Sequence, residues 1–238
     1  MNNSLFIFNK FLNILFPETC PVCSKKSRDH QIAPICSECW NSIGPYTGAM
    51  CQRCGKPLVS DSSTFCGGCL ESEPAFVSAR SFGLYDGVLR KAINHLKYYG
   101  RRRLAGPLAE MMIGMQLPQA DTVIPVPLHK SRHRQREFNQ SALFARHVAR
   151  NLNAALIINS LTKIRDTAPQ VGLSYKERVK NVRNAFGTEN KDNIAGKKII
   201  LVDDVVTTGS TIRECAKVLK KTGASRVYVV SLAHGVSD

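Results

Sequence analysis

The sequence has no long apolar run, and none of its stretches approaches the roughly 18 residues that a membrane-spanning helix needs. It is also poor in acidic residues, with 18 Asp and Glu against 33 Lys and Arg, which gives a formal net charge of +15. The first shortage argues against a protein embedded in a membrane. The second favours polyanionic partners such as nucleic acid or polyphosphate, with a basic protein that has no such partner as the alternative.

The first 16 residues lack the marks of a signal peptide, because they have neither a basic start nor a small-residue cleavage site. Residues 4–16 are nevertheless mostly apolar. We expect residues 1–16 to form a short amphipathic helix packed on the body, and peripheral contact with the inner face of the membrane is the alternative. The cysteine spacing indicates a reducing compartment, so we expect a cytoplasmic protein.

Eight of the nine cysteines form four Cys-x-x-Cys pairs, which are Cys20 and Cys23, Cys36 and Cys39, Cys51 and Cys54, and Cys66 and Cys69. Two such pairs complete a tetrahedral four-thiolate zinc site. We therefore predict two structural Zn²⁺ sites within residues 17–74, one held by the first two pairs and one by the last two. Spacing alone leaves an interleaved pairing open. The pattern repeats after about 30 residues, which suggests two zinc ribbons in series. The ninth cysteine, Cys215, is predicted to be a core residue.

The strongest functional signal lies in residues 199–214. Ile199–Val202 is an unbroken apolar run typical of a central parallel strand, and two adjacent acids follow it. A turn of hydroxyl residues and glycine comes next, and Thr211-x-x-Glu214 predicts a capping box at the start of a helix. A turn at a helix N-terminus favours an anion, because unpaired N–H groups and the helix dipole meet there. The alternative is an ordinary strand–turn–helix whose acids cap the turn.

This stretch resembles the phosphoribosyl-pyrophosphate (PRPP) loop of type I phosphoribosyltransferases. Both have four hydrophobic residues, two acids, two hydrophobic residues and then Thr-Thr-Gly-Ser-Thr. The resemblance implies that Asp203 and Asp204 are the catalytic acids, which hold the ribose 2′ and 3′ hydroxyls of PRPP with Mg²⁺ as the accompanying ion. It also implies that the phosphate is bound by Val205, Val206, Thr207, Thr208, Gly209, Ser210 and Thr211.

Two further segments take the positions of phosphoribosyltransferase loops. A predicted strand over residues 122–127 leads into a strongly basic segment, where that family places its pyrophosphate loop. The residues assigned to this loop are Pro127, Leu128, His129, Lys130, Arg132, Arg134 and Arg136. Residues 163–186 match the flexible lid of the family, and an ordinary surface loop is the alternative. The candidate contacts in the lid are Lys163, Arg165, Thr167 and Gln170.

A predicted helix over residues 87–99 ends in a segment that mixes aromatic and basic residues. Single-strand binding surfaces use such a mixture, because rings stack on bases and cations meet phosphates. The candidate nucleic-acid-binding residues are Lys97, Tyr98, Tyr99, Arg101, Arg102 and Arg103. The alternative is a solvated helix end whose tyrosines pack inward.

Taken together, the cysteine pairs, Ile124-Pro-Val-Pro-Leu128, the Arg-x-Arg-Glu-Phe-Asn-Gln segment at 134–140 and the PRPP-like loop resemble the ComF/GntX family. The resemblance covers nearly the whole chain, and one departure is Glu137, where members often have glycine. It implies a competence protein that handles single-stranded DNA during natural transformation. It also implies a phosphoribosyltransferase-like body at 75–238 behind a double zinc ribbon at 17–74.

Strands alternate with helices in the body, so we predict an α/β fold with an open, mostly parallel sheet and the ligand at the carboxyl ends of the strands. Three functions follow from this sequence. The first is single-stranded DNA handling with a site for PRPP or a related phosphorylated ribose. The second is an active Mg²⁺-dependent phosphoribosyltransferase of unknown acceptor. The third is a non-catalytic adaptor that docks a competence helicase or a recombination protein.

Overall fold

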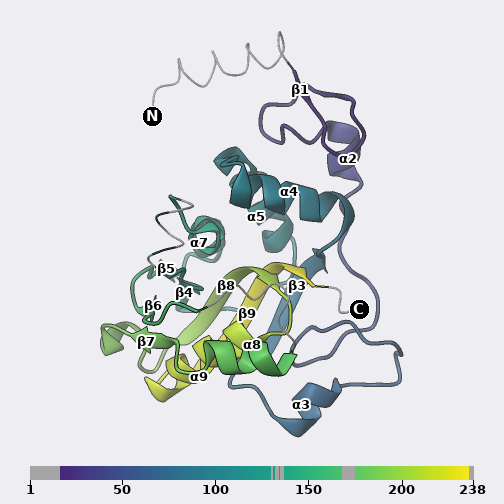
Figure 1. Ribbon diagram of the computed structural model, residues 1–238. Helices are drawn as coiled ribbons and strands as arrows, with labels where there is room; N and C mark the ends of the chain where they lie inside the picture. The colour runs from purple at the N-terminus through teal and green to yellow at the C-terminus, as the bar shows by residue number, and fades with distance from the viewer. Residues whose placement is uncertain (1–16, 130, 132–133, 135–136, 168–174, 236–238) are drawn as a thin grey trace.

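The computed structural model describes residues 17–129, 131, 134, 137–167 and 175–235 (Figure 1). The predicted N-terminal amphipathic helix lies outside the described residues. The helices and strands are β1 (Glu18–Thr19), β2 (Lys26–Ser27), α2 (Ser37–Asn41), α3 (Gly67–Glu71), β3 (Ser78–Leu84), α4 (Gly87–Tyr98), α5 (Ala105–Ile113), β4 (Thr122–Pro125), α7 (Gln140–Leu152), β5 (Ala155–Leu156), β6 (Leu161–Lys163), α8 (Tyr175–Val182), β7 (Phe186–Thr188), β8 (Lys198–Val206), α9 (Ser210–Lys221) and β9 (Arg226–His234). Two short 3₁₀ helices cover Arg102–Leu104 and Lys191–Asn193.

Five strands form one sheet in the order β3-β9-β8-β4-β5, and every neighbouring pair in it is parallel. The predicted parallel α/β fold is therefore confirmed. The central strand β8 is completely buried from Ile199 to Val202, as its apolar run predicts. It is longer than expected, because pairing with β9 continues as far as Val206 and His234. The acid pair thus belongs to the end of the strand itself.

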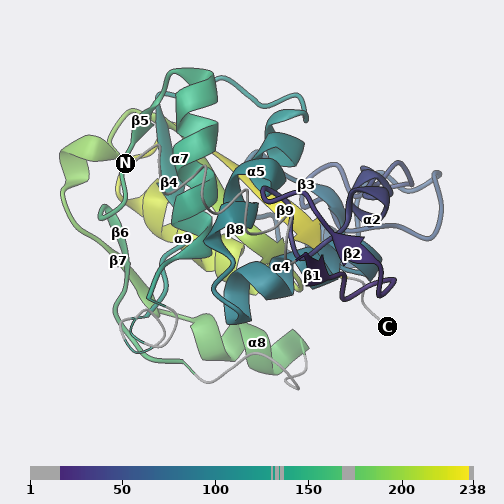
Figure 2. The ribbon, with the colours of Figure 1, turned by 90° about the horizontal axis from the view of Figure 1, so that it is seen from above.

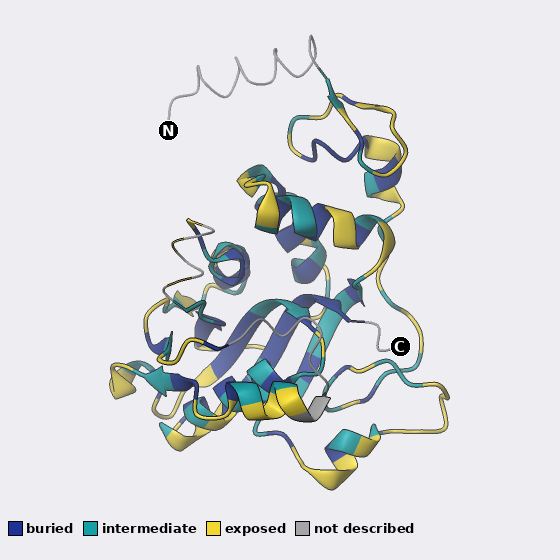
Figure 3. Ribbon diagram, in the orientation of Figure 1, coloured by how far each residue is buried: buried dark blue, intermediate teal, exposed yellow. Residues whose placement is uncertain are grey.

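Helices cover both faces of this sheet (Figures 1 and 2). Successive strand residues point to opposite faces, so the two sets of β8 side chains enter different cores. Ile200 and Val202 pack in one cluster with α4, α5 and α7, whereas Ile199 and Leu201 pack in the other with α9. Figure 3 shows the strands as a buried layer between the partly exposed helices. The carboxyl ends of β4, β8 and β9 therefore meet at one edge of the sheet, where a ligand of this fold type binds.

The two cysteine modules lie on opposite sides of the sheet (Figure 1). Cys20, Cys36 and Cys39 belong to the core cluster of α4 and α5. Cys54 of the second module packs against the other cluster, which contains α9. Each module is thus anchored to a different layer of the body. The proposed division of the chain at residues 74 and 75 stays a prediction.

The helix that follows the acid pair begins differently from the prediction. Its N-cap is Gly209, with φ of +75°, and α9 starts at Ser210. Glu214 Oε1 accepts a hydrogen bond from the Asn184 N–H at 2.8 Å. The predicted capping box at Thr211 and Glu214 is therefore wrong, because a glycine in the left-handed region turns the chain before Thr211 is reached. Cys215 is fully buried in the core, as predicted.

Helix α7 is held at its start by Asn139. The side chain of Asn139 accepts from the Ser141 N–H at 3.0 Å and donates to the Val126 carbonyl at 2.9 Å. These two bonds tie the first turn of α7 to the end of β4. No helix in the described part of the chain has the length and hydropathy needed to cross a bilayer.

Candidate functional site

The acid pair at the end of β8 is held by two helices from the same side of the sheet. Asp203 Oδ1 accepts from the Ser141 hydroxyl of α7 at 3.1 Å and from the Asp204 N–H at 2.9 Å. Asp204 Oδ1 lies 2.8 Å from the ammonium of Lys97, which comes from α4. Both side chains of this ion pair are nearly buried, with 11% of Lys97 and 13% of Asp204 exposed. The acids are thus fixed in place before any ligand binds.

The location of Lys97 corrects its assignment to the nucleic-acid surface. Its ammonium faces Asp204 and lies 5.9 Å from the centre of the Tyr85 ring, so it does not belong to the exposed basic segment. The sequence contained a signal for this location. Leu89, Ile93 and Lys97 are four residues apart, and the first two are buried on the inner face of α4. Lys97 therefore lies on the same inner face of α4 as these two buried residues. Ser141, the other contact of the acid pair, was not anticipated at all.

The charges of the site are strongly coupled. Burial and the neighbouring Asp204 charge raise the pKa of Asp203 to about 7, although the Asp204 N–H, Lys97 and Ser141 oppose the rise. Burial is the largest influence on the pKa of Lys97 and lowers it, but the Asp204 charge and its hydrogen bond, together with Tyr85 and Asp203, hold that pKa above its usual value. The ammonium is therefore charged at neutral pH, and it balances one of the two buried acids.

The loop after β8 has the form of an anion site. Gly209 takes the left-handed conformation at the head of α9, a helix of 12 residues. The Thr208 hydroxyl lies 3.1 Å from the Ser210 hydroxyl and 3.4 Å from the Ser210 N–H. Gly235 packs beneath the loop, where a Cβ would lie 3.0 Å from Thr207. The first-turn N–H groups of α9 have no carbonyl partners within the helix, so this end of the helix favours a phosphate.

The other assigned loop residues, Val205, Val206 and Thr211, flank this turn. Val206 is buried, with its carbonyl accepting from the Gly235 N–H at 2.7 Å, and Val205 is partly buried. These two valines support the loop from within the strand. Thr211 lies in the first turn of α9.

The basic loop after β4 lies next to the acid pair, because Pro125 of β4 pairs with Val202 of β8. Pro127, Leu128 and Lys163 line one cavity of about 400 Å³, so the structure brings the loop after β4 and the start of the predicted lid together. His129 Nδ1 lies 3.2 Å from Asp166 Oδ2, a second contact between the two segments. Arg134 is described but forms no part of this cavity. Lys130, Arg132 and Arg136 lie outside the described residues.

The lid residues also contact one another. The Lys163 ammonium donates to the Thr167 hydroxyl at 2.7 Å. Arg165 donates to the carbonyls of Asn181 and Arg183 at 2.9 and 2.8 Å, which ties the lid to the end of α8. Gln170 lies outside the described residues. The assignment of these residues to pyrophosphate stays a prediction.

Glu137 has a backbone that explains why family members often carry glycine there. Its φ is +63°, in the left-handed region that costs an ordinary side chain about 1 kcal/mol or more. Its carboxylate lies 3.1 Å from Arg102, whose guanidinium also covers the ring of Phe138 at 4.5 Å. This chain therefore keeps the glycine conformation with a glutamate and adds a contact to the basic segment.

Some residues of the basic segment after α4 are exposed to solvent, and others form ion pairs. Tyr98 and Tyr99 are 63% and 68% exposed, and Tyr99 stacks on His95 with ring centres 4.6 Å apart. Arg101 and Arg103 both bind Glu18 of the first cysteine module, Arg101 at 2.7 Å. The two tyrosines and Arg102, whose side chain is 52% exposed, thus form the accessible part of the segment, and Arg101 and Arg103 hold the first ribbon against α4.

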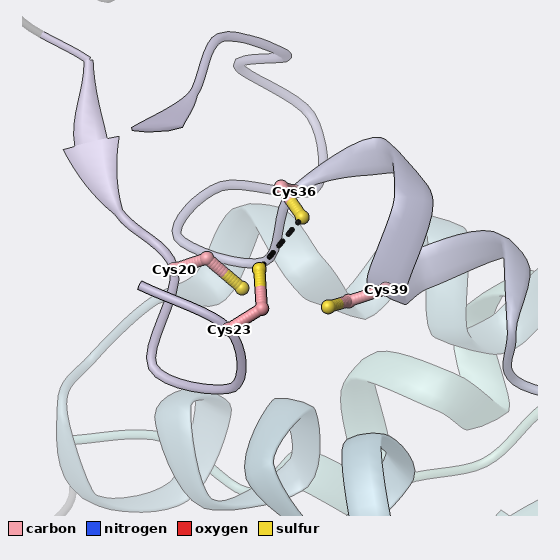
Figure 4. Close-up of side chains that lie close together, drawn as sticks. All are labelled: Cys20, Cys23, Cys36 and Cys39. Atoms are coloured by element: carbon pink, nitrogen blue, oxygen red, sulfur yellow. Dashed lines mark hydrogen bonds between the residues drawn. The ribbon is translucent and has the colours of Figure 1, made fainter. Parts of the chain in front are cut away.

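The eight paired cysteines form two four-sulfur clusters, whose Sγ atoms lie within 4.8 Å of one another in each cluster. Cys20, Cys23, Cys36 and Cys39 form the first (Figure 4), and Cys51, Cys54, Cys66 and Cys69 form the second. This confirms the predicted pairing of neighbouring knuckles. Four thiolates at such spacing suit a closed, structural Zn²⁺ site.

One cysteine of each cluster ionises readily, whereas burial and neighbouring sulfurs raise the pKa of others, among them Cys39 and Cys69. Burial raises the pKa of Cys20, but backbone N–H groups of Cys36, Cys23 and Val22 lower it to about 6. The equivalent Cys51 has the same balance and a pKa of about 6. A thiol that ionises this readily is a good zinc ligand.

Comparison with known proteins agrees with this architecture. A model of the double zinc ribbon domain matches residues 11–70, and a model of the phosphoribosyl transferase domain matches residues 139–237. The chain is similar to the DNA utilization protein YhgH of Salmonella typhimurium, with 36% identity over 205 residues that cover 82% of this chain and 88% of the relative. It is also similar to Competence protein F of Haemophilus influenzae, with 32% identity over 210 residues that cover 84% and 90%.

Among solved structures, glutamine PRPP amidotransferase from B. subtilis, complexed with ADP and GMP, aligns at a TM-score of 0.38 and 22% identity, over 53% of this chain and 25% of that one.

The curated relatives match most of the chain at more than 30% identity, in agreement with the motifs quoted above. The chain therefore belongs to the ComF/GntX family, which includes DNA utilization protein YhgH and Competence protein F.

Proposed function

We propose that the protein handles single-stranded DNA during natural transformation and binds PRPP or a related phosphorylated ribose in its phosphoribosyltransferase-like body. One observation supports the binding of a phosphorylated ribose. Asp203 and Asp204 end the central strand directly before the glycine turn of α9, so groups suited to ribose hydroxyls and to a phosphate adjoin each other. The competence and DNA-utilization names of the relatives support the first half of the proposal.

The carboxylates of Asp203 and Asp204 supply some of the ligands that a Mg²⁺ site needs. Carboxylate oxygens are ligands that Mg²⁺ accepts, usually one or two of them together with phosphate oxygens of the substrate. Lys97 already neutralises Asp204 at 2.8 Å. We therefore expect Mg²⁺ to arrive on the pyrophosphate of PRPP, with the acid pair receiving the ribose hydroxyls.

A glycine substitution tests the phosphate loop. Gly209→Val should weaken PRPP binding at least about tenfold, because a β-branched residue resists a φ of +75° and will shift the N–H groups of the turn. We expect a stability cost of about 1–3 kcal/mol from the same strain. Calorimetric titration with PRPP measures the first effect, and thermal unfolding the second.

Gly196 offers a matched control. It has a φ of +72°, no atom lies within 4 Å of the position that a Cβ would take, and it precedes β8, at the other end of that strand from the turn. Gly196→Val should lose a similar amount of stability and keep wild-type PRPP affinity. If Gly209→Val binds PRPP as tightly as Gly196→Val and wild type do, the loop does not bind the phosphate.

The exposed tyrosines provide the test of DNA binding. The variant Tyr98→Ser/Tyr99→Ser should bind labelled single-stranded DNA at least about tenfold more weakly, because stacking of one base on one ring is worth about 1–3 kcal/mol. Fluorescence anisotropy at fixed salt measures this, since phosphate contacts vary with ionic strength. Tyr98→Phe/Tyr99→Phe keeps both rings and should bind like wild type. The segment has no role in DNA binding if the serine variant matches wild type.

An active phosphoribosyltransferase is the second candidate function. The cavity shared by the loop after β4 and Lys163 favours it, because a leaving pyrophosphate needs cations in a partly enclosed site. Release of pyrophosphate from PRPP in the presence of an acceptor separates this activity from binding alone. An adaptor that docks a helicase or recombination protein predicts PRPP binding without release.

A further inference from the structure

A cavity of about 370 Å³ lies between the second zinc ribbon and the phosphate loop. The loop contributes Thr207, Thr208 and Gly209 to its wall, and the ribbon contributes Lys56, Gly68 and Glu71 among others. This volume is at the small end of ligand pockets, and it suits a group the size of a sugar phosphate. Two segments about 150 residues apart in the sequence therefore enclose one site.

The second ribbon is fixed to the helix that carries the loop. Arg213 donates from Nη1 to the Ser72 carbonyl at 2.9 Å and from Nη2 to Cys69 Sγ at 3.0 Å. The Arg213 N–H itself donates to the Gly209 carbonyl at 2.9 Å. One residue thus joins a zinc ligand to the glycine of the phosphate turn, so the ribbon and the loop are held in a fixed relation.

The internal repeat reveals a difference between the two ribbons. Lys25 and Lys56 occupy the same place in their knuckles, because the carbonyl of each accepts at 2.8 Å from the first cysteine of its own knuckle. In the first ribbon, Glu38 neutralises Lys25 at 2.6 Å. In the second ribbon the place of Glu38 is taken by Gly68, two residues after Cys66. Within the described residues the ammonium of Lys56 has no ion pair or hydrogen bond, and Lys56 lines the cavity.

A buried histidine in the wall of the cavity also has a ring nitrogen without a hydrogen-bond partner among the described residues. His234 ends β9, is 4% exposed and lines the cavity. Its Nδ1 lies 2.8 Å from the Gly235 carbonyl, so Nδ1 carries the proton and Nε2 is an acceptor. Nε2 has no hydrogen-bond partner in the part of the chain that the structure describes. The cavity therefore offers a cation and loop N–H groups for an anion, together with an acceptor for a hydroxyl.

We propose that Lys56 of the second zinc ribbon binds the phosphate held by the loop at Thr207–Gly209, so that this ribbon is one wall of a sugar-phosphate site. The proposal rests on the proposed function, and it adds to that function a ligand residue from outside the phosphoribosyltransferase-like body. A phosphorylated sugar matches both halves of the cavity, since its phosphate meets Lys56 and a hydroxyl other than the two assigned to Asp203 and Asp204 meets His234. Inorganic phosphate lacks the second contact and should bind more weakly than ribose 5-phosphate.

The test is calorimetric titration of the zinc-loaded full chain with ribose 5-phosphate. Lys56→Met should lower the affinity about tenfold, and Lys56→Arg should restore most of it, since a charged hydrogen bond is worth about 1.5–3 kcal/mol. Gly68→Glu, which copies the acid of the first ribbon, should weaken binding by a similar factor because it neutralises Lys56. Lys25→Met is the matched control in the first ribbon and should bind like wild type.

The outcomes separate this inference from the proposed function. If wild type binds ribose 5-phosphate, Gly209→Val weakens it, and Lys56→Met and Gly68→Glu both bind like wild type, the role of Lys56 is refuted and the loop stays a phosphate site. If wild type does not bind ribose 5-phosphate at all, both claims are refuted. Zinc content and thermal unfolding should match wild type in Lys56→Met, because Lys56 is exposed.

Discussion

Replacement of Lys97 by methionine is expected to lower the free energy of unfolding by about 3–5 kcal/mol at pH 8, because it removes one partner of a buried ion pair. Methionine retains the apolar stem of lysine but leaves Asp204 beside Asp203 without a cation. Only 13% of the Asp204 side chain is exposed, so water compensates little of the lost charge. Denaturant unfolding measures the change.

The loss should grow with pH. Asp203 has a pKa of about 7 in the folded protein against 3.8 as the ordinary value, so the native state binds more protons than the unfolded state between these values. Stability from this group is complete below pH 3.8 and is lost as the pH rises through 7. Lys97 opposes the rise of that pKa. Without Lys97, ionisation of Asp203 in the folded protein costs more free energy. Lys97→Met should therefore lose less stability at pH 5, where Asp203 is protonated, than at pH 8.

Two variants serve as controls for Lys97→Met. Lys91 lies on the exposed side of the same helix, and Lys91→Met should change stability by about 0.5 kcal/mol or less. The double variant Lys97→Met/Asp204→Asn removes both charges and should be more stable than Lys97→Met alone. Equal stability of Lys97→Met and Lys91→Met would show that the acid pair does not depend on α4.

Asp203→Asn should have opposite effects on stability and on binding. Asparagine keeps an oxygen that accepts from Ser141 and from the Asp204 N–H, but it removes the charge that burial and Asp204 disfavour. The variant should therefore be more stable than wild type at pH 8, by an amount on the order of 4 kcal/mol, and equal to it below pH 4. Its affinity for PRPP should fall at least about tenfold, because a ribose hydroxyl loses a charged acceptor.

This combination distinguishes a binding role from a structural one. A carboxylate kept only for stability would not be disfavoured by its own surroundings, and its removal would not strengthen the fold. Burial and the neighbouring acid disfavour the charged form of Asp203, so its ionisation lowers the stability of the fold. Groups whose pKa is shifted in this way cluster at functional sites. A variant that is less stable than wild type at pH 8 would contradict this role of Asp203.

The sequence predicts the local features of the site well. Apolar runs indicate the buried parallel strands, and the spacing of the knuckles indicates both zinc clusters, because each of these depends on residues that are near in sequence. The order of acids, hydroxyls and glycine after Val202 likewise places the candidate loop at the end of β8. The error at the start of α9 arose because Gly209 turns the chain earlier than the capping pattern predicts.

The relations between distant segments could not be predicted in the same way. The contact of Lys97 with Asp204 joins residues more than 100 positions apart, and it depends on how α4 packs over the sheet. The same holds for the second ribbon, whose position beside the candidate phosphate loop follows from Arg213 and not from any local pattern. Separation of the two ribbons on opposite sides of the sheet is equally a matter of tertiary packing.

The most direct test of the phosphoribosyl site is calorimetric titration of PRPP with Mg²⁺ into wild type and Asp203→Asn at pH 8, with zinc content equal in both. We expect saturable binding to wild type and at least about tenfold weaker binding to the variant, whose fold is the more stable of the two. PRPP binding of equal strength in the two proteins, or no binding to wild type, would contradict the assignment of the acid pair to ribose.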